Sequence, residues 1–309
     1  MTEKAASPMF ARVALIGIGL INSSLARVLR RDGMAGHIAI CARTRATLDK
    51  AMALGLADSA TIDPGVAVKD ADLVVIGTPL GAYADVAQNM ASSLKPGCIV
   101  TDVGSVKEAV IRTVAPHLPA GVHLVPAHPV AGTEHSGPEA GFAELFENRW
   151  CIITPAAGTD PAAVERVVEL WRRAGMKIQM MEAGRHDKVL AITSHVPHLI
   201  AYTIVGTATD LEGDLRDEVI KFSAGGFRDF TRIAASDPTM WRDIFLTNKE
   251  AVLEMLGRFS EDLIALRRAI RRDEGQTLHD VFTRTRQIRR GVIDAQQHIP
   301  PKGPKNNAA

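Results

Sequence analysis

The fold of this chain is decided by one stretch near its start, Arg12-Val13-Ala14-Leu15-Ile16-Gly17-Ile18-Gly19-Leu20-Ile21-Asn22-Ser23-Ser24. The run that ends at Ile16 is short and apolar, which is typical of a parallel strand buried on both faces. An amphipathic helical pattern follows the glycines and stops at Asp32-Gly33. A strand, a glycine turn and a helix together are the setting of a dinucleotide site.

Each residue of the glycine turn has an expected task. Gly17 permits the tight turn, and Gly19 lets backbone N–H groups approach a pyrophosphate, whose negative charge the helix N-terminus favours. Leu20 and Ile21 begin the helix, and we expect them to contact the cofactor as well. Asn22 stands where the full pattern has a third glycine, so the helix and strand are expected to pack less closely there.

The residues that follow the second predicted strand, 37–42, bear on the choice of cofactor. An NAD site usually has an acidic residue about twenty positions beyond the glycines, where it binds the ribose hydroxyls. Here Arg43, Thr44 and Arg45 hold that place, and the next acid is Asp49. Since an arginine pairs bidentately with a 2′-phosphate, the sequence favours NADP. The alternative is that both arginines are ordinary solvated charges and that NAD is used.

Buried strands and amphipathic helices alternate along residues 1–182. Strands are expected at 73–76, 98–101 and 122–125, helices at 46–54, 83–93 and 107–114, and a closing helix and strand at 161–174 and 176–181, after the short run 150–154. This alternation predicts an α/β fold with a Rossmann-type doubly wound parallel sheet. Ligands bind at the carboxyl ends of such strands, so three loops are expected to meet there, those with Thr78-Pro79, with Asp102-Val103-Gly104-Ser105-Val106-Lys107 and with His128.

The densest group of special residues is Val125-Pro126-Ala127-His128-Pro129-Val130-Ala131-Gly132-Thr133-Glu134. It follows an apolar run, so it is expected as a loop at a strand end. The prolines stiffen the backbone beside His128, and Gly132 permits tight geometry. A rigid loop can aim an imidazole, although a lone histidine near a loop is more often a polar residue without a catalytic task.

After residue 182 the sequence changes to long helical periodicity, which predicts an all-α domain over residues 183–298. Helical spacing in its first helix places four side chains on one stripe: Asp187, Ala191, Ser194 and His198. His195 lies on the flank of that stripe, and Pro197 is expected to kink the helix at the histidines because it cannot donate a backbone hydrogen bond. The kink can form a site wall. Two satisfied core histidines are the alternative, and zinc is disfavoured because no further ligands stand at a suitable spacing.

Later segments carry arginines and a broad apolar surface. Arg228 and Arg232 lie four residues apart, and one can hold a substrate carboxylate; a salt bridge to Asp229 or Glu218 is the alternative. A helix is expected to start at Asp237 and Pro238 and to run through Trp241 and Asn248 to Leu256. The helices at 251–272 and 277–297 present more apolar surface than one layer can bury, which predicts a homodimer made through this half. We expect residues 299–309 to be a disordered tail.

Composition narrows the class of protein. The 309 residues are 46% hydrophobic, enough for two domains, and 36 basic residues balance 35 acidic ones. A chain without a strong net charge has no field that recruits nucleic acid or an anionic membrane, so a small-molecule partner is expected. Cys41, Cys98 and Cys151 show neither disulfide nor zinc spacing and are interpreted as buried thiols. Polar residues interrupt the apolar segment 13–29, so we expect a cytoplasmic protein without a membrane span.

Five motifs occur in order along the chain: Gly17-Ile18-Gly19-Leu20-Ile21, Asp102-Val103-Gly104-Ser105-Val106-Lys107, His128-Pro129-Val130-Ala131-Gly132-Thr133-Glu134, Ser194-His195-Val196-Pro197-His198 and Thr231-Arg232-Ile233-Ala234. Together they resemble the prephenate/arogenate (cyclohexadienyl) dehydrogenases of tyrosine biosynthesis, over nearly the whole chain. The glycine turn is shared by many enzymes, whereas the other motifs in series are specific. This chain departs from the family's pattern at Asn22 and in lacking an acid after the second strand.

That resemblance implies an NAD(P)-dependent enzyme that takes hydride from C4 of a cyclohexadienyl acid while the ring carboxylate leaves as carbon dioxide. By resemblance, His128 bonds the 4-hydroxyl and acts as the base, and Ser105 orients both the imidazole and the nicotinamide. Arg232 holds a substrate carboxylate, and His198 contacts the substrate with His195 nearby. The other expected site residues line or close the mouth: Thr133, Glu134 and Trp241. The resemblance implies no metal.

Two other classes of protein stay open on the sequence. A β-hydroxyacid or imine-reducing dehydrogenase has a similar two-domain plan but usually depends on a lysine of the second domain, for which Lys188 is the candidate. A non-catalytic dinucleotide sensor binds NADP and turns over no cyclohexadienyl acid. His128, Ser105 and Arg232 favour the resembled family over both.

Overall fold

The computed structural model describes residues 7–210, 218, 221–222 and 224–294. A six-stranded sheet with the order β3-β2-β1-β4-β5-β6 forms the N-terminal half, and all of its neighbouring strands are parallel. Its strands are β1 (Phe10–Ile16), β2 (Ala35–Cys41), β3 (Ser59–Thr61), β4 (Leu73–Ile76), β5 (Ile99–Asp102) and β6 (His123–Val125). The order reverses between β1 and β4, which places a ligand crevice at their carboxyl ends. The predicted Rossmann-type sheet is confirmed.

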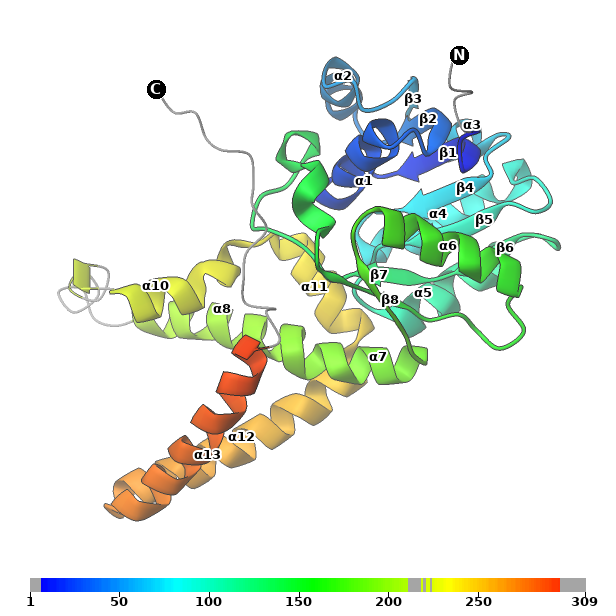
Figure 1. Cartoon of the computed structure of the whole chain (residues 1–309). Coiled ribbons are helices and arrows are strands. Elements are labelled where there is room, and N and C mark those ends of the chain that lie inside the picture. The colour runs from blue at the N-terminus through cyan, green and yellow to red at the C-terminus, as the bar shows by residue number, and fades with distance from the viewer. Residues whose placement is uncertain (1–6, 211–217, 219–220, 223, 295–309) are drawn as a thin grey trace.

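Helices cover both faces of this sheet (Figure 1). One core lies under α1 (Leu20–Arg31), α2 (Arg45–Ala53) and α6 (Pro161–Arg173), and the other lies under α3 (Pro64–Val68), α4 (Tyr83–Met90) and α5 (Lys107–Val114). Every residue of β4 and β5 is buried. β4 is therefore a continuous apolar run, because neither of its faces meets water, whereas β5 ends in the buried polar residues Thr101 and Asp102. Short helical turns extend the connections: η1 (Leu80–Ala82), η2 (Ala91–Ser93), η3 (Ala115–His117), η4 (Pro138–Ala140) and η5 (Ala143–Phe146).

His128 lies in a strand, so its predicted loop placement was wrong. It belongs to β7 (Ala127–Pro129), which pairs antiparallel with β8 (Trp150–Ile153), and β8 pairs parallel with β9 (Lys177–Met180). These three strands form a separate small sheet in the order β7-β8-β9. Only Pro126 separates β6 from β7. Pro129 is tolerated because β7 is an edge strand, where a missing N–H costs little.

The second half of the described chain is helical. Its elements are α7 (Ala183–Leu190), the π-helical segment η6 (Ala191–His195), α8 (Val196–Thr209), α10 (Gly225–Thr231), η7 (Arg232–Ala235), α11 (Pro238–Thr247), α12 (Lys249–Arg271) and α13 (Gly275–Asp294). Figure 1 shows α7 and α8 running on from one another below the sheet, and the α12–α13 hairpin projecting away from it. The predicted tail, 299–309, lies outside the described residues.

Two helical predictions were wrong in detail. His195 was expected on the flank of the stripe that contains Ser194, but His195 is fully buried and Ser194 only half-buried. The disturbance expected from Pro197 takes the form of the π-helical η6, whose i→i+5 hydrogen bonds widen the turn and shift the inward face. The long helix expected from Pro238 breaks at Asn248, where φ is −105° and ψ is 30°.

The helix Ala183–Thr209 is long and apolar enough to meet the length and composition of a membrane span, with a mean hydropathy of 1.4. Only 28% of its most apolar 18-residue segment is buried inside the protein. Its inner face, however, carries the buried polar residues His186, Asp187 and His195. An apolar outer face over a polar inner one is typical of a helix that packs between protein layers.

Candidate active site

The glycine turn leaves an open helix N-terminus. Gly17 has a φ of +83°, and a Cβ there would lie 2.7 Å from the carbonyl oxygen of Gly77, so only glycine fits. Gly19 is the N-cap of α1 and brings no side-chain cap, and a Cβ there would meet nothing within 4 Å. Uncapped N–H groups facing open space suit a pyrophosphate. The turn therefore fits a dinucleotide.

Asn22 packs closely against the sheet, which corrects the expectation of a looser fit. Its Nδ2 donates to the carbonyl oxygens of Gly17 at 2.7 Å and Val75 at 3.2 Å. A Cβ on Gly77 would lie 2.5 Å from that Nδ2. The space that a third glycine provides in the common pattern comes here from Gly77, on the facing strand end.

The end of β2 presents exposed cations beside the glycine turn. Arg43 and Arg45 are exposed, and neither pairs with an acid in the described part of the chain. Thr44 is the N-cap of α2, where its hydroxyl accepts from the backbone N–H of Thr47 at 3.2 Å. At the end of β4, the buried Thr78 hydroxyl has no partner among the described residues, and Pro79 is exposed.

His128 is the first member of a buried hydrogen-bonded chain. Its Nδ1 lies 2.8 Å from Nε2 of His186, and Nδ1 of His186 lies 2.7 Å from Oδ1 of Asp187. A carboxylate only accepts, so His186 donates from Nδ1 and accepts at Nε2. His128 then donates from Nδ1, which leaves its Nε2 as an unprotonated acceptor without a donor among the described residues. Burial, followed by the neighbouring His186, holds the pKa of His128 well below its ordinary value. The ring is therefore a neutral base.

Asp187 also fixes the domain contact. Its two carboxylate oxygens accept from the backbone N–H groups of Lys107 at 2.7 Å and Glu108 at 3.0 Å. These groups belong to the first turn of α5, so a carboxylate of the helical half caps a helix of the sheet half. The histidine chain is thereby tied to both halves of the protein.

A buried ion pair holds the strand beneath His128. Nζ of Lys107 lies 2.6 Å from Oδ2 of Asp102, and both side chains are fully buried. Lys107 also donates to the carbonyl oxygen of Ala127 at 2.6 Å, and the N–H of Ala127 donates to Oδ1 of Asp102 at 3.2 Å. The pair thus hydrogen-bonds both the N–H and the carbonyl oxygen of Ala127, the residue before His128. Burial lowers the pKa of Lys107, against the pull of Asp102.

Three aromatic rings of the helical half form a second wall. His198 stacks on Trp241 with ring centroids 3.7 Å apart, and its Nδ1 lies 2.8 Å from the carbonyl oxygen of Ser194. His195 meets Trp241 edge-on at 6.1 Å. Trp241 packs in turn with Val106 of the sheet half. Burial lowers the pKa of His195 to about 4 and also lowers that of His198.

Arg232 reaches back to the segment that follows His128. It pairs with Glu134 at 3.1 Å, whereas Asp229, an alternative partner, pairs with Arg228 at 3.2 Å. Backbone hydrogen bonding, with a smaller contribution from Arg232, lowers the pKa of Glu134. The Thr133 hydroxyl accepts from the backbone N–H of His135 at 3.2 Å. One exposed ion pair therefore links the two halves.

Sequence reasoning missed part of this arrangement. Ser105 is half-buried in the turn before α5, and no described residue hydrogen-bonds to its hydroxyl, so its orienting role stays a prediction. His186, Lys107 and Asn248 were not expected in the site. An available signal was the adjacent acid in His186-Asp187, and another was a lysine five residues after a strand-terminal aspartate.

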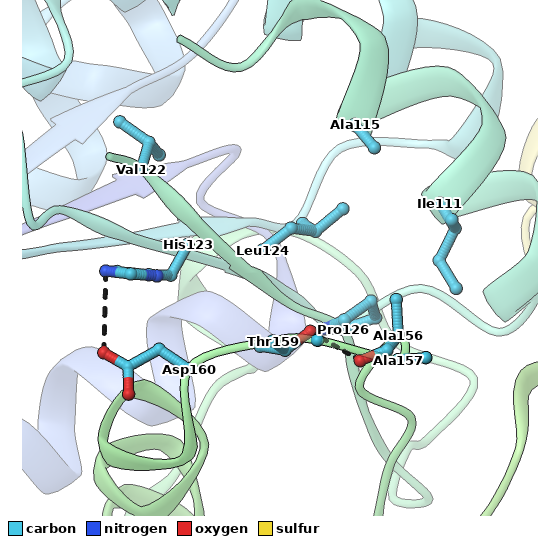
Figure 2. Close-up of a pocket in the computed structure, with 11 residues that line it drawn as sticks. Ile111, Ala115, Val122, His123, Leu124, Pro126, Ala156, Ala157, Thr159 and Asp160 are labelled. Atoms are coloured by element: carbon cyan, nitrogen blue, oxygen red, sulfur yellow. Dashed lines mark hydrogen bonds and ion pairs between the residues drawn. The ribbon is translucent and has the colours of Figure 1, made fainter. Parts of the chain in front are cut away.

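A cavity of about 260 Å³ lies elsewhere, at the β6 edge of the sheet (Figure 2). Its walls come from β6, the end of α5 and the turn before α6, and His123 faces Asp160 there with 3.8 Å between Nε2 and Oδ2. None of the site residues described above lines it. We assign the site by its polar groups and not by this cavity.

Two family models match the chain. The model for the nucleotide-binding domain of prephenate dehydrogenase matches residues 25–180, and the model for the dimerization domain of prephenate dehydrogenase matches residues 182–284. The chain belongs to the prephenate dehydrogenase family. Its members are oxidoreductases, so this chain is an enzyme that uses a nicotinamide dinucleotide and a small-molecule substrate.

Named relatives extend the match over most of the chain. A cyclohexadienyl dehydrogenase from Zymomonas mobilis is 42% identical over 91% of this chain and 96% of its own length, and a Bacillus subtilis prephenate dehydrogenase is 32% identical over 94% and 78%. A solved prephenate dehydrogenase from A. aeolicus, in complex with hydroxyphenyl propionate and NAD+, has a TM-score of 0.85, 32% identity and coverage of 94% and 100%. For a Synechocystis arogenate dehydrogenase these values are 0.76, 26%, 91% and 99%.

Proposed function

We propose that this prephenate dehydrogenase family member oxidatively decarboxylates prephenate to 4-hydroxyphenylpyruvate, arogenate to tyrosine, or both, in tyrosine biosynthesis. One observation carries the proposal. The chain from His128 through His186 to Asp187 leaves a neutral, buried imidazole with a free Nε2 acceptor. A reaction that must take a proton from a substrate hydroxyl needs such a base.

The reaction balances with the residues present. The C4–H bond gives its electron pair as hydride, the bond to the ring carboxylate breaks to release carbon dioxide, and the ring becomes aromatic. The 4-hydroxyl proton moves to Nε2 of His128 as the hydride leaves, and the resulting positive charge is stabilised through His186 by Asp187. The same proton returns to the ring oxygen once carbon dioxide has left, so the product is the neutral phenol. The bound dinucleotide supplies the hydride acceptor. Burial strengthens each of these electrostatic contributions, because little water competes for the groups.

The other expected residues take roles around that base. Ser105 orients the imidazole and the nicotinamide, and Arg232 exchanges its Glu134 partner for a substrate carboxylate. His198 and His195 contact the substrate. The remaining residues line the mouth or close the pocket: Thr133, Glu134 and Trp241. Asp102 supports β7 through its ion pair with Lys107, and it accepts a hydrogen bond from the backbone N–H of Gly104. Its contribution to cofactor binding is therefore indirect, because it shapes the loop that follows β5.

NADP is the proposed cofactor in preference to NAD. The exposed Arg43 and Arg45 stand at the end of β2, where an acid would serve the ribose of NAD. Thr44 caps α2 and holds this loop. Gly17, Gly19, Leu20, Ile21, Thr78 and Pro79 complete the proposed cofactor site. Replacing both arginines with alanine should raise KM for NADP far more than KM for NAD; equal effects on the two would remove the preference.

We also propose that the protein is a cytoplasmic homodimer. Within each chain, the boundary between the dinucleotide-binding domain and the helical domain lies between residues 182 and 183. The matched dimerization domain and the apolar side chains exposed on the helical half support this assembly, among them Leu246, Leu253, Leu263, Ile264, Ile270, Phe282 and Ile288. Large apolar side chains left exposed together are typical of a protein–protein interface. Sedimentation of the purified protein at several concentrations tests it.

The rival lysine-dependent dehydrogenases lack support. Lys188, their candidate, is 64% exposed at its side chain and pairs with Glu254 at 3.7 Å. It therefore stands outside the buried histidine chain. A dinucleotide sensor would bind cofactor without any turnover, and the turnover assay described next distinguishes it from an enzyme.

Reduced-cofactor formation should be measured with prephenate or arogenate against NAD or NADP, in four combinations. Turnover is expected in at least one, and His128→Asn should lower kcat by about 10²–10⁴-fold with little change in KM. Absence of turnover in all four, from folded protein that binds dinucleotide, would refute the function. Near-normal turnover by His128→Asn would remove His128 from the mechanism.

A further inference from the structure

Asn248 sits at the break between α11 and α12 with its amide turned inward. It is 5% exposed, and its Nδ2 lies 2.9 Å from the carbonyl oxygen of Asp187 and 3.0 Å from Nδ1 of His195. A backbone carbonyl only accepts, so the atom facing Asp187 is the amide nitrogen. The same nitrogen therefore also donates its second hydrogen to His195.

This contact fixes the tautomer of His195. Because Nδ1 accepts a hydrogen bond, it carries no proton, and the proton of the neutral ring stays on Nε2. The ring is fully buried, and burial lowers its pKa. The charged groups around it have opposing effects, since Asp187 raises its pKa and His186 and His198 lower it. His195 is thus a neutral donor.

The donor on Nε2 is left without an acceptor. No residue in the described part of the chain accepts from this buried atom. The indole N–H of Trp241, whose ring centroid lies 6.1 Å from that of His195, is a second buried donor without a partner. Buried N–H groups are nearly always paired in native proteins, so two such donors on adjacent rings indicate a ligand that supplies oxygen. His195 also lies close enough to His128 to contribute to the lowering of its pKa.

We propose that Asn248 is a positioning residue that holds His195 as an Nε2–H donor to an oxygen of the substrate. This rests on the proposed function, which supplies a substrate with two carboxylates. The acceptor is a carboxylate oxygen shared by prephenate and arogenate or the keto oxygen of prephenate. This arrangement disfavours an ammonium group beside Nε2 of His195, because an ammonium can only donate hydrogen bonds.

Asn248→Asp reverses the arrangement with almost no change in size. A carboxylate at this place accepts from Nδ1–H of His195, which leaves Nε2 of the neutral ring without its proton and removes the donor to the substrate. Substrate KM should rise by about ten- to a hundredfold, which is the effect expected from the loss of one hydrogen bond to a charged group. The dissociation constant of the dinucleotide should stay unchanged, which shows that the fold is intact.

The test combines a spectrum with a double-mutant cycle. Nitrogen-15 spectra of histidine-labelled protein, with the signal assigned by its loss in His195→Ala, should show a bare Nδ1 and a protonated Nε2. In Asn248→Asp the proton should appear on Nδ1. In the His195→Ala background, Asn248→Asp should cause no further rise in substrate KM, because Asn248 acts through His195.

Three results would overturn the proposal: a protonated Nδ1 in the unaltered protein, an unchanged substrate KM in His195→Ala, or a full Asn248→Asp effect without His195. A rise in KM for both substrates in His195→Ala assigns a shared carboxylate, and a rise for prephenate alone assigns the keto oxygen. The spectrum needs no turnover, so a failure of the proposed function would be seen separately.

Discussion

Lys107→Met should destabilise the protein severely, because it leaves the buried side chain of Asp102 without its cationic partner. The Lys107 ammonium lies 2.6 Å from that carboxylate, both groups are fully buried, and Nζ also holds the carbonyl oxygen of Ala127. Removing one partner of a buried pair costs about 3–5 kcal/mol. With a shift of about 2–4 °C per kcal/mol for a chain of this size class, Tm should fall by roughly 6–20 °C.

The chain contains its own control. Lys95 pairs with Asp72 at the same 2.6 Å, and its Nζ likewise donates to a backbone carbonyl, that of Asp70, but its side chain is 39% exposed. Exposed pairs contribute about 0–1 kcal/mol. Lys95→Met should therefore barely change Tm. The ion-pair distance and the number of hydrogen bonds from Nζ are matched, although the bond to the carbonyl is 3.1 Å for Lys95 and 2.6 Å for Lys107, so burial is the main difference between the two pairs.

A double variant separates charge from packing. Asp102→Asn combined with Lys107→Met removes both charges and should recover most of the lost stability, since apolar or neutral replacement of a buried pair is often nearly neutral. Thermal unfolding followed by circular dichroism gives the three Tm values. Equal losses in Lys107→Met and Lys95→Met, or a double variant no better than Lys107→Met, would refute the reasoning.

Three further predictions concern the glycine turn, acid stability and the thiols. Gly77→Ala should raise KM for the dinucleotide and lower stability by about 1–3 kcal/mol, since the new Cβ would meet Asn22 at 2.5 Å; unchanged cofactor kinetics would contradict this. The pKa of His195 is about 4 in the folded protein, so the unfolded chain binds a proton below about pH 6.5 that the folded chain does not. Stability in urea should fall by about 3 kcal/mol between pH 6.5 and 4 from this ring, and His195→Gln should remove that part of the loss. Burial raises the pKa of Cys41 to about 11 and of Cys98 to about 12, so a thiol reagent at pH 8 should react only after unfolding, and fast reaction of the native protein would contradict their burial.

The sheet could be predicted because its signals are local. The central strands β1 and β4 are buried over most of their length, so their sequences contain short apolar runs, and Gly17 and Gly19 mark a turn that fits a dinucleotide. Family motifs added the expectation of His128, Arg232 and the histidine pair. Each of these motifs spans fewer than about ten consecutive residues, so it can be recognised without tertiary information.

The small sheet and the helix breaks could not be predicted from such signals. β7 has three residues, and its partner β8 lies more than twenty positions away, so no local pattern distinguishes it from a loop. The break at Asn248 interrupts a good helical pattern, because the amide binds Asp187 and His195 instead of pointing to solvent.

The sequence by itself determined the sheet, the dinucleotide turn and the family of the enzyme, because each depends on residue types at fixed spacing along one segment. Only the tertiary structure decided which partners set the protonation of the histidines. His128 meets His186 across 58 residues, and Asn248 meets His195 across 53. A hydrogen-bond network depends on distances of a few tenths of an ångström between atoms of different elements, and those distances exist only once the elements have packed.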